Sequence, residues 1–71
     1  MDYVAMGRTI RDLRRRHGWS MAQLAQMAGV SLSYMGHIER GTRKLSLETA
    51  ASLAQALNVT LDSLIVRKKQ A

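Results

Sequence analysis

The sequence predicts an all-α domain of five short helices, and three observations point to that class. Hydrophobic residues make up 46% of the 71 residues, which argues against a chain that stays disordered. Aromatic residues are only 4% and phenylalanine is absent, so the core must be built from aliphatic side chains and alanine, which suit closely packed helices. Proline is also absent, and one pattern of helix-capping residues recurs along the chain.

The first helix is expected over residues 3–17, with Asp2 as a weaker N-cap candidate and Gly18 as its stop. The capping pattern is clearest at the second helix, expected over residues 21–28. Ser20 and Gln23 have the spacing of a capping box, and Gly29 ends this helix because glycine adopts a positive φ without strain.

The same signals predict three further helices over residues 32–40, 47–57 and 61–67. Their N-caps are expected at Ser31, Ser46 and Thr60. The stops of the third and fourth helices are expected at Gly41 and Asn58. Apolar residues recur on one stripe of each helix, as one shared core requires. Residues 67–71 are expected to be a frayed tail.

Length and composition exclude several classes of protein. The chain is long enough for one domain, residues 1–71. It has no cysteine, which excludes disulfides and thiol chemistry and favours the cytoplasm. The polar N-terminus does not resemble a signal peptide, and no apolar run is long enough to span a membrane. Eleven Lys and Arg against five Asp and Glu leave a net charge of +6, which favours a polyanionic partner such as nucleic acid.

Groups that could carry catalysis do not occur in useful combinations. The five acidic residues form no spaced carboxylate pair, and His17 and His37 lie on different predicted helices without metal-ligand spacing. The glycines do not form a phosphate-binding loop. We therefore expect no enzyme activity, no catalytic residue, no metal, no cofactor and no small-molecule ligand.

The second and third predicted helices are joined by only three residues, Gly29 to Ser31. Two short helices with so tight a link cross steeply, as in a helix-turn-helix. In that motif the second helix enters the major groove of double-stranded DNA, and residues near its N-terminus contact base edges.

Four stretches carry a more specific resemblance: Gly18–Ala25, Gly29–Gly41, Ser46–Thr49 and Leu53–Val59. They resemble the XRE family of lambda-repressor-like helix-turn-helix domains, and the match extends over about residues 6–66. Within that family, the stretch from Tyr34 to Leu47 is most similar to restriction–modification controller proteins. The resemblance implies a five-helix fold that binds palindromic operator DNA as a homodimer.

The third predicted helix carries the expected base contacts. Because Met35 and Ile38 face inward, the opposite surface matches the base-facing positions of the family. The expected base contacts are Leu32, Ser33, Tyr34, Gly36 and His37. Leu32 can pack on a thymine methyl group, Ser33 can hydrogen-bond a base edge and His37 can donate to guanine. Tyr34 has two open interpretations, partial core packing or contact with a base or phosphate.

The expected phosphate contacts surround this helix. They are Ser20, Met21, Gln23, Ser31, Arg40, Thr42, Arg43 and Lys44. The family often has glutamine where this chain has Met21, which leaves only a backbone N–H at a helix N-terminus. Related controllers often have arginine where this chain has Leu32, so their operator sequences do not transfer directly. The alternative for the loop after the third helix is a solvated segment without a partner.

Two further roles are expected from other parts of the chain. The resemblance implies an ion pair between Arg14 and Glu39 that is at least partly buried. One recognition helix reads only a few base pairs, so a two-fold homodimer is expected. Its interface residues are expected to be Asn58, Val59, Leu61 and Ile65, with ordinary core packing as the alternative.

The leading hypothesis is a cytoplasmic, sequence-specific transcriptional regulator that is bacterial or phage-encoded, most specifically a restriction–modification controller. A phage-type repressor and an antitoxin are alternatives of the same class. A protein-interaction module on this fold is an alternative of another class, which the basic stretch from Arg40 to Lys44 disfavours. A membrane-surface peptide is disfavoured because five short capped helices differ from one long amphipathic helix. An activator would also contact RNA polymerase, although the sequence identifies no patch for it.

Overall fold

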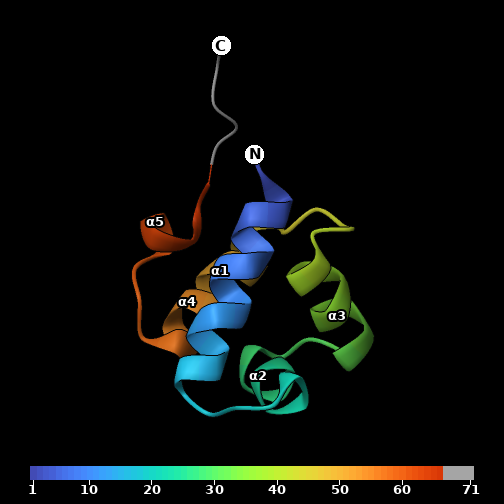
Figure 1. Cartoon of the computed structure of the whole chain (residues 1–71), viewed down its shortest axis with the longest axis vertical. Coiled ribbons are helices and arrows are strands. Elements are labelled where there is room, and N and C mark those ends of the chain that lie inside the picture. The colour runs from blue at the N-terminus through green and yellow to red at the C-terminus, as the bar shows by residue number, and fades with distance from the viewer. Residues whose placement is uncertain (67–71) are drawn as a thin grey trace.

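A computed structural model of the chain describes residues 1–66 and contains five α-helices, with no strand in that range (Figure 1). The helices are α1 (Tyr3–Arg16), α2 (Met21–Ala28), α3 (Leu32–Arg40), α4 (Leu47–Leu57) and α5 (Leu61–Leu64). Figure 1 shows α1 in front of α4, with α3 and α5 on opposite sides and α2 at the end away from the N-terminus. The predicted all-α class is confirmed.

Side-chain caps begin the helices where the sequence predicts them. The hydroxyl oxygens of Ser20, Ser31 and Ser46 accept hydrogen bonds from the N–H groups three residues on, at 3.0–3.1 Å. Thr60 does the same for α5 at 3.2 Å. The carboxylate of Asp2 caps α1 by accepting from the N–H of Ala5 at 3.0 Å. These bonds satisfy backbone donors that the first helical turn leaves unpaired.

Left-handed residues end three of the helices. Gly29 has φ 72°, Gly41 has φ 71° and Asn58 has φ 59° at the ends of α2, α3 and α4. Asparagine tolerates this region better than most residues with a side chain, so Asn58 can take the role that glycine has elsewhere. The three predicted stops are confirmed.

The ends of α1 and α5 differ from the predicted ranges. The first helix ends at Arg16, one residue before the predicted end. The last helix was expected over residues 61–67 but ends at Leu64, because Ile65 has an extended backbone with ψ 116°. The carbonyl of Val66 then accepts a hydrogen bond of 2.7 Å from the N–H of Asp2. This long-range bond fastens the described end of the chain to the start of α1, and position 67 lies outside the described residues.

All five helices contribute to one core. Its largest fully buried side chains are Met6, Ile10, Leu24, Met35, Ile38, Leu53, Leu57 and Leu64. Leu13, Leu61 and Ile65 are only partly buried and pack against this core. The core therefore fixes α3 through Met35 and Ile38 and leaves the opposite side of that helix outside.

Glycine allows α1 and α3 to approach at backbone distance. A Cβ atom on Gly7 would lie 2.3 Å from the carbonyl oxygen of Ile38. A Cβ atom on Gly41 would lie 2.5 Å from the Cα of Val4. No side chain fits at such distances, so the position of α3 against α1 depends on both glycines.

Candidate nucleic-acid interface

The inner side of α3 is held by an ion pair with α1. Nε of Arg14 donates to Oε2 of Glu39 at 2.7 Å, and Nη2 donates to Oε1 at 2.9 Å. The side chains of Arg14 and Glu39 are 11% and 4% exposed, so the pair is largely removed from water. The hydrogen bonds and the charge of Glu39 raise the pKa of Arg14 despite the opposing effect of burial. The structure thus contains the pair that the family resemblance implied.

Arg14 also reaches the turn before α2. Its Nη1 donates to the carbonyl oxygen of Trp19 at 2.8 Å, so one guanidinium connects α1, α3 and the entry to α2. His17 stacks on the indole of Trp19 with ring centroids 4.1 Å apart, and its Nε2 lies 3.2 Å from the carbonyl oxygen of Leu57. The position of His17 in the sequence indicates only a helix end and gives no signal for these contacts. These contacts link the end of α1 to the turn before α2 and to the end of α4.

The outer side of α3 carries side chains that are exposed to solvent. Leu32 is 54% exposed, Ser33 is exposed and His37 is partly exposed. Within residues 1–66, the hydroxyl of Ser33 has no hydrogen-bond partner in the structure. These three residues of the predicted base-contacting set are therefore accessible to a ligand.

Gly36 departs from its expected place on this surface. It is buried, because the guanidinium of Arg40 folds back over it. Nη1 of Arg40 lies 3.0 Å from the position that a Cβ atom on Gly36 would occupy. Gly36 is thus not an exposed base-facing position in this structure, and the absence of its side chain makes room for Arg40.

The structure favours the first of the two interpretations of Tyr34. Its ring is partly buried against the core, and its hydroxyl donates to the carbonyl oxygen of Lys44 at 3.1 Å. Tyr34 thereby attaches the loop after α3 to that helix. Its hydroxyl proton is already used in this bond, so contact with DNA would be limited to accepting a hydrogen bond.

Thr42 also differs from the expectation that it contacts phosphate. Its N–H and its hydroxyl both donate to the carbonyl oxygen of His37, at 3.0 Å and 3.4 Å. Its hydroxyl oxygen lies 2.8 Å from Nδ1 of the same histidine. Because phosphate oxygens are acceptors, Thr42 has no donor left for them in this arrangement. Its contacts are with His37.

The starts of α2 and α3 carry hydrogen-bond donors that the caps do not use. Ser20 and Gln23 form the predicted capping box, with Ser20 N–H donating to Gln23 Oε1 at 2.7 Å. The Gln23 amide nitrogen and the hydroxyl protons of Ser20 and Ser31 are not used by these caps. The side chain of Met21 packs against the core, which leaves its backbone N–H at the start of α2. Helix N-termini of this kind favour anions.

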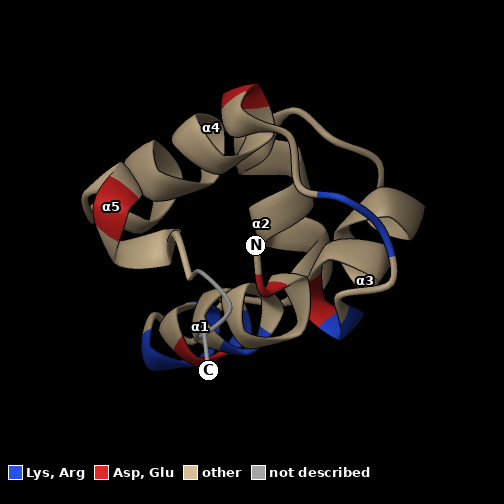
Figure 2. Ribbon diagram, turned by 90° about the horizontal axis from the view of Figure 1, so that it is seen from above, with Lys and Arg blue, Asp and Glu red and all other residues tan. Residues whose placement is uncertain are grey.

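The loop between α3 and α4 adds positive charge at the other end of α3. Arg43 and Lys44 are exposed, and Figure 2 shows this loop as a cationic stretch that follows α3. The exposed Arg40 ends α3 at the start of the same loop. These three side chains form no ion pair within the described part of the chain. Their charge is available to a polyanion.

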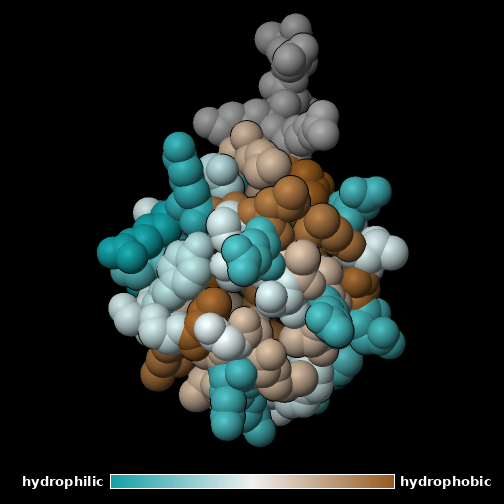
Figure 3. Space-filling view, turned by 180° about the vertical axis from the view of Figure 1, so that it is seen from behind, coloured by the Kyte–Doolittle hydropathy of each residue, from teal (hydrophilic) through white to brown (hydrophobic). Residues whose placement is uncertain are grey.

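The residues expected in a dimer interface gather near α5. Asn58 is exposed, while Val59, Leu61 and Ile65 are partly buried and pack against the core. Figure 3 shows apolar side chains gathered on the α5 side of the face that it presents. The same residues therefore contribute to the core and keep part of their apolar surface outside it.

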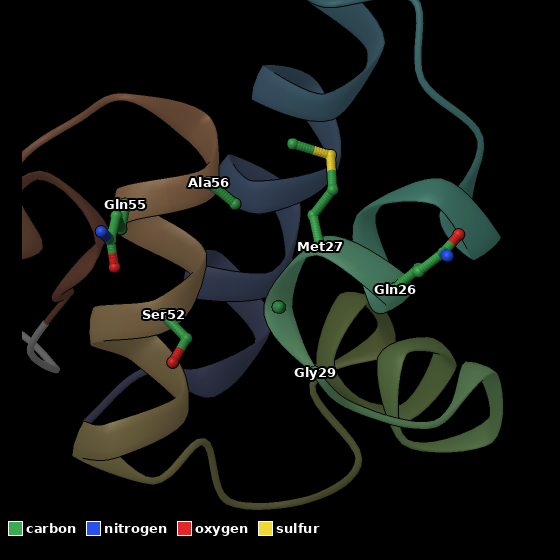
Figure 4. Close-up of a pocket in the computed structure, with 7 residues that line it drawn as sticks. Gln26, Met27, Gly29, Ser52, Gln55 and Ala56 are labelled. Atoms are coloured by element: carbon green, nitrogen blue, oxygen red, sulfur yellow. The ribbon is translucent and has the colours of Figure 1, made fainter.

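A hollow lies on another face of the molecule, between the end of α2 and α4 (Figure 4). Its volume is about 480 Å³, and its lining has no titratable side chain: Gln26, Met27, Ala28, Gly29, Ser52, Gln55 and Ala56. The side chains of Gln26 and Gln55 point away from each other in Figure 4, so they do not converge on a ligand. None of the predicted DNA-contacting residues lines it.

Two features are absent from residues 1–66. None of the helices there is long and apolar enough to cross a membrane. No group of three potential ligands in that range is placed to hold a metal ion.

Comparisons with known proteins agree with this geometry. The helix-turn-helix family model HTH_3 matches residues 10–64. An uncharacterized HTH-type transcriptional regulator of Mycobacterium tuberculosis is 43% identical over 61 residues, which cover 86% of this chain and 44% of that protein. The chain thus spans less than half the length of that relative.

Two solved structures are similar over nearly the whole chain. The restriction-modification controller protein C.AhdI from Aeromonas hydrophila has a TM-score of 0.86 and 39% identity, covering 90% of this chain and 97% of that one. The biofilm regulator SinR of Bacillus subtilis, crystallised in complex with DNA, has a TM-score of 0.79 and 32% identity. That match covers 83% of this chain and 95% of SinR.

Proposed function

The chain belongs to the helix-turn-helix family, and from this premise we propose that it is a transcriptional regulator that binds specific operator DNA. The resemblance to XRE-type domains, and to controller proteins among them, holds in both sequence and fold. The relatives are regulators rather than enzymes, in agreement with the expectation of no catalysis. The finer statements below, on operator, contacts and assembly, are our proposals.

The observation that carries the proposal is the exposed side of α3. Leu32, Ser33 and His37 are exposed or partly exposed there, while the opposite side of the helix is fixed by the core and by Glu39. We infer that α3 enters the major groove and that these three side chains read base edges. Leu32 would pack on a thymine methyl group, and Ser33 would donate or accept a hydrogen bond.

Phosphate contacts would come from both sides of that helix. On one side are the caps of α2 and α3, where Ser20, Gln23 and Ser31 keep donors that the caps do not use. On the other side are Arg43 and Lys44 in the exposed loop. Contacts to two backbone strands would orient α3 in the groove without selecting a sequence. Arg40 would also contact phosphate if its guanidinium moved away from its position over Gly36.

We further propose that two copies bind a palindromic site. One α3 contacts too few base pairs for physiological specificity, whereas a two-fold dimer reads two half-sites one helical turn apart. The apolar surface of Val59, Leu61 and Ile65 beside the exposed Asn58 is the part of the chain that we assign to the interface. Sedimentation over a range of concentrations tests this assignment. A chain that remains monomeric at high concentration and on DNA would exclude the dimer.

The most specific form of the proposal is a restriction–modification controller in the bacterial cytoplasm. The likeness to C.AhdI, which covers nearly all of both chains, favours it over a phage-type repressor or an antitoxin. Contact with RNA polymerase would follow if the protein activates transcription. A protein-interaction module remains the alternative of another class, and DNA-binding measurements separate it from a regulator.

The decisive experiment is selection from a randomised DNA pool, followed by titration of the selected site and scrambled DNA over a salt series. We expect a two-fold symmetric site bound at least about 10³-fold more tightly than scrambled DNA. Enrichment of no site, with an affinity that merely falls as salt rises, would show only non-specific binding to phosphate and would overturn the proposal. A pull-down from the source cells would then test for a protein partner.

A further inference from the structure

Arg40, the last residue of α3, sends its side chain back along the helix to Gly36. Outside the adjoining residues and the helix backbone, the three atoms nearest to the place of a Cβ atom on Gly36 all belong to this guanidinium. They are Nη1 at 3.0 Å, Nη2 at 3.4 Å and Cζ at 3.5 Å. At Gly7 and Gly41 the nearest atoms are instead backbone atoms from another part of the chain. The missing side chain of Gly36 therefore leaves room for a charged group.

This place for the guanidinium is on the outer side of α3. Gly36 comes three residues after Ser33, and Arg40 comes three residues after His37, so helical spacing makes neighbours of the residues in each pair. Four residues correspond to about 6 Å along a helix axis. By folding back to Gly36, the side chain moves its charge from the C-terminal end of α3 to the middle of the helix. Base contacts in a helix-turn-helix are made toward the N-terminal part of this helix, so the fold back brings the charge closer to them.

The guanidinium of Arg40 has no hydrogen-bond partner within residues 1–66. Both carboxylate oxygens of the adjacent Glu39 already accept hydrogen bonds from Arg14. No carboxylate in that range forms an ion pair with Arg40, and the residue is exposed. A guanidinium carries five N–H donors in one rigid plane and accepts no hydrogen bond. These donors are therefore available to a ligand that offers two acceptors side by side.

Guanine is the base that offers such a pair in the major groove. Its N7 and O6 are adjacent acceptors, which arginine binds with two parallel hydrogen bonds. Adenine presents one acceptor beside a donor, cytosine presents a donor, and thymine presents a single acceptor beside a methyl group. A guanidinium at the middle of the outer side of α3 is placed for base edges, whereas the charges of Arg43 and Lys44 in the loop are placed for the DNA backbone.

We propose that Arg40 is a specificity-determining residue: its guanidinium, in the room that Gly36 leaves on the outer side of α3, binds N7 and O6 of a guanine in the operator. The inference rests on the proposed function, because it requires α3 in the major groove. It gives Arg40 a different role from the phosphate contact that the sequence suggests. Gly36 contacts no base in this account and is a positioning residue that admits the guanidinium.

The first test compares the base preferences of the wild type, Arg40→Gln and the control Arg43→Gln by DNA selection. At one position of each half-site the wild type should favour guanine over the other bases by roughly five- to 150-fold, the value of one bidentate contact. Arg40→Gln should lose this preference. Arg43→Gln removes the same charge from the loop, so it should weaken binding to operator and scrambled DNA alike and keep the preference for guanine. If Arg40→Gln behaves as Arg43→Gln does, Arg40 contacts phosphate alone and the inference is wrong.

The second test asks whether Gly36 acts through Arg40. Gly36→Ala keeps every charge but places a methyl group 3.0 Å from the present position of Nη1, so the guanidinium must shift. The preference for guanine should fall, while affinity for scrambled DNA and its salt dependence should stay as in the wild type. In the Arg40→Gln background the same substitution should have no further effect on that preference. An unchanged preference in Gly36→Ala, or an equal loss in both backgrounds, would overturn the role given to Gly36 and with it the inference.

Failure of the inference and failure of the proposed function give different results. If the wild type selects an operator and Arg40→Gln keeps all its base preferences, Arg40 reads no base, although the protein is still an operator-binding regulator. If the wild type selects no operator, the proposed function fails. Nuclear Overhauser contacts in the free protein then still test the geometry, because the Hα protons of Gly36 should show contacts with the end of the Arg40 side chain. Their absence would contradict the inference whatever the DNA experiments show.

Discussion

The two sides of α3 differ in how far their residues are engaged in contacts with the rest of the protein. On the inner side, both carboxylate oxygens of Glu39 are paired with Arg14, and Gly7 of α1 lies against the backbone of Ile38. On the outer side, Leu32 is 54% exposed and Ser33 keeps its hydroxyl free of partners within the described residues. The inner side therefore determines where the helix lies, and the outer side can change its residues without disturbing that position. Substitutions on the two sides should separate stability from binding.

The largest effect is expected at Glu39 on the inner side. Glu39→Gln leaves the guanidinium of Arg14 buried without its counter-charge, which should lower the free energy of unfolding by about 3–5 kcal/mol. Glu48→Gln is the matched control, since Glu48 is exposed in the first turn of α4 and should contribute no more than about 1 kcal/mol. Thermal and urea unfolding measure both variants. An unchanged melting temperature for Glu39→Gln would contradict this account of the ion pair.

The pH dependence of this pair follows from the raised pKa of Arg14. A base whose pKa is higher in the folded state adds stability at every pH below its unfolded pKa, and that stability is lost only as pH rises through the folded pKa. For arginine both values are strongly alkaline. As far as the titration of Arg14 is concerned, the contribution of the pair to the free energy of unfolding should therefore be constant through the neutral pH range.

Two glycines of the α1–α3 region provide the next comparison. Gly7→Ala places a methyl group against the carbonyl oxygens of Ile38 and Glu39, so the helices must separate, and we expect a loss of about 1–3 kcal/mol. At Gly36 the new methyl group meets only the end of the Arg40 side chain, which can move. Alanine also favours helix over glycine by up to about 1 kcal/mol, so Gly36→Ala should not destabilise. Equal losses in urea unfolding would mean that backbone contact does not position α3.

Most of the helix limits could be predicted because their signals are local. Ser20 and Gln23 lie within one turn, and a glycine such as Gly29 marks a helix end by its own conformational freedom. The end of α5 was predicted too late. Just beyond it the carbonyl of Val66 is bonded to the N–H of Asp2, and no spacing within the helix reports a partner that distant in sequence.

The outer side was predicted less well for a related reason. Helical spacing places Gly36 on the surface, but it does not show that Arg40 covers it. In the sequence, Thr42 belongs to the same polar loop as the basic residues Arg43 and Lys44. Only the turn at Gly41 brings its hydroxyl to His37 and removes its donors from phosphate. The residue types at a binding surface can be predicted from the pattern, whereas their hydrogen-bond partners depend on side-chain conformations.

A smaller effect, on binding alone, is expected at Ser33. Ser33→Ala removes an exposed hydroxyl without a partner in the described part of the chain, so stability should stay within about 0.5 kcal/mol of the wild type. Operator affinity should fall by about 0.5–1.5 kcal/mol, the value of one net hydrogen bond. Gln55→Ala on the exposed side of α4 is the control and should change neither quantity. Loss of stability in Ser33→Ala would assign this residue to the fold rather than to the interface.

The smallest change in sequence preference is expected in the loop after α3. Lys44→Gln removes one exposed charge, which should weaken binding to operator and scrambled DNA by the same factor and reduce the salt slope by about one. Arg16→Gln, at the end of α1, removes the same charge from an exposed site that we do not place at the DNA and should leave the slope nearly unchanged. Equal changes for both variants would mean that overall charge, and not the loop, attracts the DNA. A weakening confined to operator DNA would instead show that Lys44 contacts bases rather than phosphates. The base-contacting surface would then extend beyond α3.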